Sequence, residues 1–378
     1  MMKKSLSAVL AALMLLTSLP AMAQTTIDPK EDRNITLQEV GLNEVEEGVS
    51  PTTGLTLEYI EVEEGQTGMA LTGRYLPMLV QVGNDEGGVG NRAPWGATYA
   101  DMVYEMPNHQ NGPTRLTFLF NDVVPDSVGF VRSARVGHVW LREEWGAGFL
   151  FYGQQEHEGS NVLEEFRRLG HSAIGDPLLF SGMVGEGKAW YKYYTERAGL
   201  KSPYHIDGNV AGMYSLIPED YVAPNHAFRF TDATPEGDDA LEVTVNWDSD
   251  NFKYDSKLVY DIESNTYLRY MIYKNNVLHP WVDKDTEEQI GFANVIVQFT
   301  DITYNNSPDA PVVKMVGEGN ADFFMAGKHV AGYWKRDDYT SRTVYYDADG
   351  NEISLQRGKT LVIVFPNGKR DGRGVSYE

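Results

Sequence analysis

The sequence predicts an α/β N-terminal domain, a mixed sheet with flanking helices, followed by an all-β C-terminal domain. Apolar runs alternate with helical patterns over residues 69–220, whereas residues 241–378 hold short apolar runs separated by turn signals. A stretch rich in Pro, Asp and Gly lies between them and predicts a linker at residues 221–240. The chain of 378 residues is also longer than one core usually supports. We therefore expect two domains, each with its own core.

The first 23 residues have the pattern of a signal peptide. Lys3 and Lys4 precede an apolar run that ends at Leu16, and Ala-Met-Ala at positions 21–23 provides a cleavage site before Gln24. The apolar run is too short to span a bilayer comfortably. No later segment resembles a transmembrane helix, so the mature chain is expected to lack a membrane span and to be secreted or otherwise extracytoplasmic.

Composition excludes several classes of function. The net charge is −22, and it becomes −24 once the two signal-peptide lysines are removed, which disfavours binding to nucleic acid or anionic lipid. The chain has no cysteine, which excludes a disulfide framework, thiol catalysis, Cys-ligated zinc and a lipidated cysteine. Residues 24–68 are acidic and poor in apolar side chains, and they predict a flexible lead.

The N-terminal half contains four apolar runs typical of buried strands and three helical patterns. The strand candidates begin at Leu76, Asp101, Thr114 and Ala147. The pattern at residues 133–145 predicts a helix capped by Ser133, and that at residues 160–170 predicts one capped by Ser160 or Asn161 and ended by Gly170. The pattern at residues 188–199 predicts a third helix, closed by Gly199.

The C-terminal half shows a succession of strand patterns and no long helical one. The expected strands lie in residues 241–247, 257–262, 266–274, 293–304, 311–319, 342–355 and 360–366. Asn275-Asn276 and Asp349-Gly350 are typical hairpin turns. These observations predict an all-β module.

Four motifs suggest specific chemistry, and each departs from the pattern that the chemistry needs. The Gly-rich loop at residues 81–94 lacks the Lys-Ser/Thr of a P-loop and the spacing of a dinucleotide site. The segment GHSAIG at residues 170–175 has its second glycine one residue late for a nucleophile elbow. His157-Glu158 has no second histidine one turn on, and residues 347–352 lack the distal acid of a calcium loop. These motifs predict no metal site and identify no cofactor, and they leave open only a metal site assembled from the distant His138, His157, His171 or His205.

The remaining candidates are polar residues at the ends of apolar strands. They form the predicted ligand-binding set: Arg92, Asp101, Glu105, Thr114, Arg115, Arg132, Ser133 and Arg135. Arg132 and Arg135 surround the expected start of a helix, where free N–H groups and the helix dipole favour an anion. Guanidinium groups there suit phosphate or carboxylate. The same residues also suit an Arg–Asp/Glu network that only ties a helix to a sheet, and the sequence leaves both readings open.

These motifs resemble the YerB-like bacterial envelope proteins, a family catalogued as domain of unknown function DUF3048 with N- and C-terminal parts. The N-terminal resemblance rests on Ala-Asp-x-Val-Tyr-Glu from Ala100, on Thr114-Arg115 and on Gly-x-x-Arg-Ser-Ala-Arg from Gly129. In the second half, VGEGNADFFMAGKHVAGYWKRD at residues 316–337 is similar to the family's β module. The resemblance covers about residues 75–370 and implies a two-domain envelope protein with no established activity.

The chain departs from the family's common form in two places. It lacks the lipobox cysteine, so the resemblance gives no membrane anchor. The segment PNHQNG at residues 107–112 replaces the usual Glu-Gly-Gly before Thr-Arg, which weakens any proposal of an acid catalyst there.

Three functions remain open at this stage. The first is an envelope binding or scaffold protein that recognises an anionic, phosphate- or carboxylate-bearing, wall or glycan component. The second is an enzyme acting on a phosphate-bearing envelope substrate. The third is a protein–protein module, with an envelope protein as partner and purely structural arginines.

Overall fold

The computed structural model describes residues 25–26, 35–172, 175–247, 254–273, 276–305, 307–368 and 373–378. The expected signal peptide, residues 1–23, lies outside the described residues. Asn275 of the expected Asn-Asn turn lies outside them too, whereas Asn276 is described and has the positive φ of 60° that such a turn requires. Among the described helices, none combines the length and the apolar character needed to cross a membrane.

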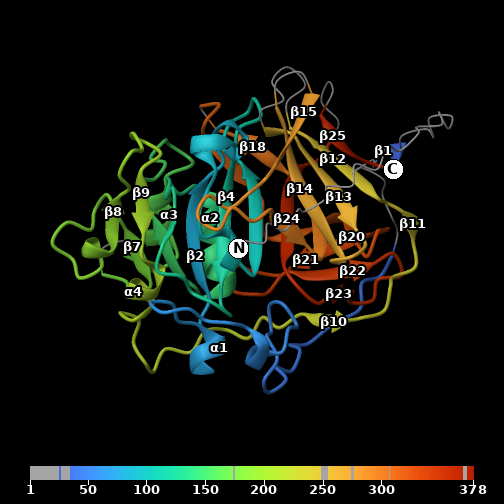
Figure 1. The fold of residues 1–378 in the computed structure, drawn as a ribbon, viewed down its shortest axis with the longest axis horizontal. Coiled ribbons are helices and arrows are strands. Elements are labelled where there is room, and N and C mark those ends of the chain that lie inside the picture. Colours follow the sequence, from blue (N-terminus) through green and yellow to red (C-terminus); the bar gives the residue numbers. More distant parts are fainter. Residues whose placement is uncertain are drawn as a thin grey trace, which may run out of the picture.

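A central sheet of eleven strands crosses the whole molecule (Figure 1). Ten of them follow one another in the order β11 (Asp238–Asp239), β21 (Lys328–Arg336), β20 (Gly317–Met325), β17 (Asn294–Thr300), β24 (Thr360–Pro366), β3 (Met102–Pro107), β4 (Thr114–Phe120), β2 (Met78–Gly83), β6 (Gly148–Phe151) and β7 (Leu179–Ser181). The eleventh, β22 (Val344–Asp347), pairs with β21. The sheet is mixed, because β24 pairs with β3 and β17 in parallel while β3 and β4 are antiparallel. The prediction is confirmed only in part, because it placed a mixed sheet within the N-terminal half and the observed sheet takes strands from both halves.

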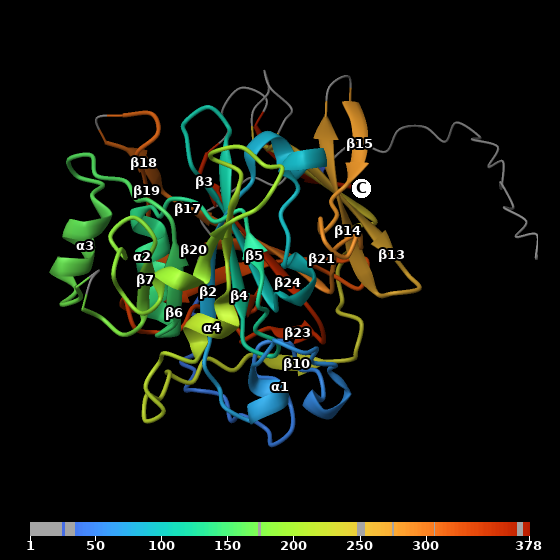
Figure 2. The same cartoon turned by 60° about the vertical axis from the view of Figure 1, so that its left-hand side comes forward.

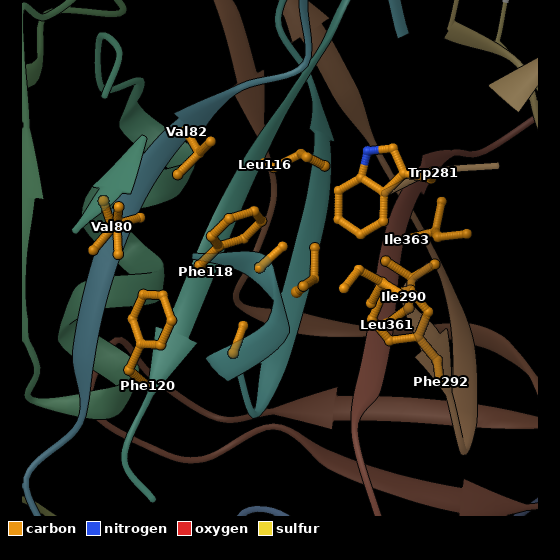
Figure 3. Packing of buried hydrophobic residues seen from close by; sticks show 14 of the residues in the cluster. Val80, Val82, Leu116, Phe118, Phe120, Trp281, Ile290, Phe292, Leu361 and Ile363 are labelled. Atoms are coloured by element: carbon orange, nitrogen blue, oxygen red, sulfur yellow. The ribbon is translucent and has the colours of Figure 1, made fainter. Parts of the chain in front are cut away.

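The two halves of the chain meet within this sheet, so the expectation of two separate cores is wrong. β3 pairs in parallel with β24, from Met102 opposite Thr360 to Glu105 opposite Ile363. β24 is buried along almost its whole length, which is typical of a central strand covered on both faces. Residues of both halves also share one hydrophobic cluster. Figure 3 shows Leu116 and Phe118 on one side of this cluster and Trp281 and Leu361 on the other.

A second sheet, of seven strands, belongs to the C-terminal half apart from its first strand. Its order is β1 (Thr25–Thr26), β25 (Gly374–Tyr377), β12 (Glu242–Asn246), β13 (Ser256–Asp261), β14 (Thr266–Tyr273) and β15 (Val277–Pro280), with β16 (Gly291–Phe292) paired to β14. Alternate residues of β12 are buried, as expected for a strand with one face on a core. Over the described residues 241–378 there is no α-helix, which agrees with the predicted all-β character.

Helices are few and short. They are α1 (Met69–Thr72), α2 (Val136–Trp145), α3 (Val162–Arg168) and α4 (Val210–Tyr214), with single 3₁₀ turns at η1 (Leu57–Tyr59), η2 (Asp85–Gly88), η3 (Gly90–Arg92), η4 (Ala97–Tyr99) and η5 (Tyr191–Tyr193). Val139 and Leu141 of α2 belong to the cluster that covers the other face of the central sheet. Figure 2 shows this helix next to the sheet. Asn161 caps α3 by accepting from two backbone N–H groups, which confirms one of the two predicted caps.

The helix predicted at residues 188–199 is wrong. That segment forms η5 and then a strand, β8 (Tyr194–Glu196), which pairs with β9 (Ile206–Gly208), and β9 pairs with β5 (Val128–Gly129). The hydroxyl of Tyr194 donates to the carbonyls of Phe151 and Phe180. These tertiary contacts override the local helical pattern.

The predicted flexible lead, residues 24–68, and the predicted linker, residues 221–240, are both partly ordered and packed against the rest of the protein. Residues 50–54 of the lead are buried, so its expected flexibility is wrong there. The linker contributes β10 (Arg229–Thr231), which pairs in parallel with β23 (Ser354–Gln356), and also β11 of the central sheet. A last pair, β18 (Ile302–Tyr304) and β19 (Pro311–Val313), packs near α2.

Candidate functional site

Arg115 lies at the start of β4, on the face of the central sheet that α2 covers. Its register partners are Met106 of β3 and Gly83 of β2. Met106 and Leu119, on the same face, belong to the cluster that includes α2. Arg115 is only 4% exposed, and its Nη1 lies 3.5 Å from the Oδ2 atom of Asp85 in η2. The guanidinium is therefore held at the end of β2, inside the protein.

Backbone hydrogen bonds fix the segment that carries Arg132. The Arg132 N–H donates to the carbonyl of Gln81 at 2.8 Å, and its carbonyl accepts from the N–H of Tyr152 at 3.0 Å. Just before it, the ring of Phe130 packs so closely on Gly83 that a Cβ there would lie 2.0 Å from the ring. Only glycine fits at that position, and this explains how the segment lies against β2.

The expected role of Ser133 as helix cap is wrong. α2 begins at Val136, and Arg135 occupies the N-cap position with extended φ and ψ. The chain stays extended that far because the N–H of Ala134 donates to the carbonyl of Gly153. The N–H of Arg135 donates to Nδ1 of His138 at 2.9 Å, while Oγ of Ser133 turns to the carbonyl of Tyr152.

Arg115, Arg132 and Arg135 converge, and we call them the arginine cluster. Nε of Arg132 lies 3.5 Å from the same Asp85 oxygen that Arg115 approaches. Nη1 of Arg135 donates to the carbonyl of Ala134 at 3.0 Å, a backbone partner without charge. The Nε atoms of all three arginines are buried and have no hydrogen-bond partner in the described part of the chain. The cluster thus holds more positive charge than its close carboxylate neutralises, and it has donors to spare.

Burial and mutual repulsion perturb the cluster. Burial, helped by nearby Arg132 and opposed by Asp85, lowers the pKa of Arg115 to about 10. Burial lowers the pKa of Arg135 to about 9, with Arg115 and Arg132 acting in the same direction and Asp309 opposing. Each guanidinium stays charged at neutral pH. Holding these charges together therefore costs free energy, which a bound anion would offset.

Arg92 joins the site through an aromatic ring. Its Cζ lies 4.6 Å from the centroid of the Tyr204 ring, and Cζ of Arg132 lies 5.9 Å from the same centroid. Tyr204 in turn packs edge-on against Phe130. Such cation–π contacts orient a guanidinium without consuming its hydrogen-bond donors.

Glu105 and Thr114 lie on the opposite face of the sheet from Arg115. Glu105 is fully buried and accepts from Nη2 of Arg269 at 2.6 Å and from the hydroxyl of Thr114 at 2.8 Å. Nδ2 of Asn84 donates to both Glu105 and Thr114. Arg269 stands over the Trp281 ring at 4.8 Å. These residues tie the second sheet to the first, and the expectation that Glu105 accompanies the arginines is wrong.

Asp101 is separated from the arginine cluster by the length of β3. It precedes Met102, whereas Arg115 pairs with Met106 near the other end of the strand. Its Oδ2 accepts from the hydroxyl of Thr52 at 2.8 Å and from the backbone N–H groups of Asn121 and Asp122. Asp101 is thus not part of the arginine cluster.

Several residues of the site were not identified from the sequence. Asp85 lies in the Gly-rich loop just after β2, and a carboxylate at the end of a strand could have been predicted as a site residue. Tyr204, His138 and Arg269 carry no local signal, because only the tertiary fold brings them near. Among the described residues, no group of three or more His, Asp or Glu side chains is arranged to hold a metal ion.

The pKa values of buried His138, on α2, and half-buried His171, beside it, are shifted in opposite directions. Burial, Arg135 and Arg115 lower the pKa of His138 well below 6.5, so the folded protein favours the neutral imidazole. The contribution of His138 to the free energy of unfolding is therefore fully present above about pH 6.5 and is lost as the pH falls. Hydrogen bonds to Asp176 and Glu143 raise the pKa of His171 to about 9, so the folded protein favours the protonated imidazole. The contribution of His171 to the free energy of unfolding is therefore fully present below pH 6.5 and is lost as the pH rises through 9.

NMR titration of the imidazole resonances checks this prediction. We expect His138 to stay neutral at pH 6 and His171 to stay protonated at pH 8, as their shifts imply. Arg135→Met should raise the pKa of His138 and leave that of His171 unchanged. A His138 that titrates near its ordinary value of 6.5 would contradict the buried arrangement.

Comparisons with known proteins follow the same division of the chain. The model described as "Protein of unknown function (DUF3048) N-terminal domain" matches residues 66–206, and the corresponding C-terminal domain model matches residues 243–362. Among solved structures, the YerB protein from Bacillus subtilis matches with a TM-score of 0.66 and 19% identity, over 87% of this chain and 99% of that one. At this identity the likeness concerns the fold alone. No curated protein matches the chain.

Proposed function

The chain belongs to the DUF3048 family of proteins of unknown function, and from that premise we propose that it is an exported envelope protein that binds an anion. The ligand is a phosphate- or carboxylate-bearing component of a wall polymer or glycan. The arginine cluster is the binding site, and the rest of the central sheet is the rigid scaffold that holds it. The role is that of a binding or scaffold protein.

One observation carries this proposal: the arginine cluster is incompletely neutralised. Arg115 and Arg132 share the Asp85 carboxylate, Arg135 adds a third positive charge, and the three Nε donors are buried without a hydrogen-bond partner in the described part of the chain. Buried donors left without a partner cost stability, and a bound anion would satisfy those of the arginine cluster. In a chain with net charge −22, a local excess of positive charge supports selection for an anionic ligand.

Titration calorimetry with inorganic pyrophosphate and with citrate tests the proposal. We expect saturable binding that weakens as salt is added. Arg132→Lys should weaken it about tenfold while the fold stays intact, because lysine keeps the charge but loses the paired donors. Arg167→Lys on the exposed side of α3 is the matched control and should bind as the wild type does.

The outcomes also distinguish the two alternative functions. Hydrolysis of pyrophosphate during the titration would support an enzyme acting on a phosphate-bearing substrate. Absence of binding to either anion, with a lower melting temperature for Arg132→Lys, would support a protein–protein module with structural arginines. Either result would overturn the proposed binding role.

Export is a separate prediction. On expression of the full chain in a bacterial host, we expect the secreted or periplasmic protein to begin at Gln24, because the Ala-Met-Ala pattern precedes it. Intact-mass measurement checks this. A membrane-bound product that retains residues 1–23 would show that this segment is an anchor.

A further inference from the structure

We propose a second binding site, for a neutral polyhydroxylated ligand such as a saccharide unit, in a pocket at the other end of β3 from the arginine cluster. The two sites differ in position, charge and lining. The inference stands independently of the anion-binding proposal, since no residue belongs to both sites.

The pocket lies where the two halves of the chain meet. Its volume is about 440 Å³, within the range of roughly 300–1,000 Å³ that is typical of small-molecule sites. Asp101, at the start of β3, and Asp122, after β4, line it from the N-terminal half. Lys359, at the start of β24, and Thr266 of β14 line it from the C-terminal half. A site between two such segments is a common place for a ligand.

Asp101 supplies an acceptor that the protein leaves unused. The residue is 3% exposed, and its three hydrogen bonds, from Thr52 and from two backbone N–H groups, all go to Oδ2. Oδ1 accepts no hydrogen bond from the described residues, and it is not one of the polar side-chain atoms that are fully buried without a partner. Because Asp101 lines the pocket, we infer that Oδ1 is accessible from it. A buried carboxylate oxygen of this kind calls for a hydroxyl or amide donor from a ligand.

Lys359 supplies the complementary donor. Its Nζ donates to the carbonyls of Thr98 at 2.5 Å and Ala100 at 3.0 Å, which leaves one of its three protons for a ligand oxygen. The backbone holds this residue beside Asp101, because the N–H of Thr360 donates to the Asp101 carbonyl at 3.1 Å.

The charges that line the pocket nearly cancel. Asp101, Asp122 and Glu61 carry the negative charges, and Lys359 and Arg357 carry the positive ones. Such a lining attracts neither a small anion nor a small cation, and it favours a neutral polar ligand.

The rest of the lining matches the two surfaces of a sugar ring. Four hydroxyl side chains lie around the pocket, and a tyrosine ring and three aliphatic side chains lie beside them: Thr53, Thr98, Ser264, Thr266, Tyr99, Leu55, Ile60 and Val123. A saccharide presents hydroxyl groups at its edge and C–H groups on its face, so it can use both kinds of surface. A purely apolar ligand would leave the buried carboxylates without donors.

Ligand-detected NMR and calorimetry with methyl β-D-glucoside and N-acetylglucosamine test the proposal. We expect saturable binding of at least one probe. Asp101→Asn should weaken it about tenfold, because an amide oxygen can keep the bonds from Thr52 and the backbone while its NH₂ group replaces the free acceptor. The same variant should bind pyrophosphate as the wild type does, and Arg135→Met should leave saccharide binding unchanged.

Ser264→Trp keeps the test decisive if Asp101→Asn fails to fold. Ser264 is exposed at the rim, so an indole there should obstruct the pocket without burying a charge, and saccharide binding should be lost. The proposal is overturned if neither probe binds at millimolar concentration, or if both variants bind as the wild type does. Loss of pyrophosphate binding alone would overturn only the anion-binding proposal.

Discussion

Replacing Glu105 by alanine is expected to lower the free energy of unfolding by about 3–5 kcal/mol, because it leaves the buried Arg269 guanidinium without its partner. Both side chains have no solvent exposure, and their 2.6 Å contact joins the central sheet to the second sheet. The change also removes the acceptor of Thr114. Urea denaturation followed by tryptophan fluorescence measures the effect.

Two variants serve as controls for this prediction. Arg168→Ala breaks an ion pair with Glu165 on the surface of α3 and should cost under about 1 kcal/mol. Glu105→Leu combined with Arg269→Met removes both buried charges and should recover much of the lost stability. A loss for Glu105→Ala no larger than that for Arg168→Ala would contradict the buried pairing.

Replacing Arg115 and Arg135 together by methionine is expected to weaken pyrophosphate binding by at least about a hundredfold, since each charged hydrogen bond contributes about 1.5–3 kcal/mol. The same change should leave the melting temperature unchanged or raise it. The lowered pKa values of both arginines mean that their charges are unfavourable in the folded protein at neutral pH. Methionine keeps similar volume without the charge.

The melting temperature separates a binding role from a structural one. A site built to bind often reduces stability, whereas a structural ion-pair network adds to it. Arg167→Met, on the exposed side of α3, should change neither binding nor stability. A fall of many degrees in the melting temperature of the Arg115/Arg135 variant would show that the arginines hold the fold together.

The strands of the C-terminal half could be predicted because their local patterns are clear, but their partners could not. The apolar run at Thr360–Pro366 indicated a buried strand. Nothing local indicated that it pairs with β3, more than 250 residues earlier, because strand pairing depends on tertiary register. The separate cores expected for the two halves were wrong for this reason.

The arginine cluster was predictable in part. Arg132 and Arg135 precede a helix that the sequence indicated, and Arg115 opens a strand beside it. Asp101 was misplaced because the four residues of extended strand between it and Glu105 span about 13 Å, which carries it away from the Arg115 end of β3. Glu105 was misplaced because it faces away from Arg115, and only the register between β3 and β4 reveals that.

NMR of the arginine Nε–Hε groups during titration with pyrophosphate tests the central claim most directly. If the arginine cluster binds the anion, the Nε resonances of Arg115, Arg132 and Arg135 should shift together and saturate with one dissociation constant, because those donors have no hydrogen-bond partner among the described residues. The resonance of Arg167 should not move. If the three resonances do not respond, or if every exposed arginine shifts in the same unsaturable way, the arginine cluster is not an anion-binding site.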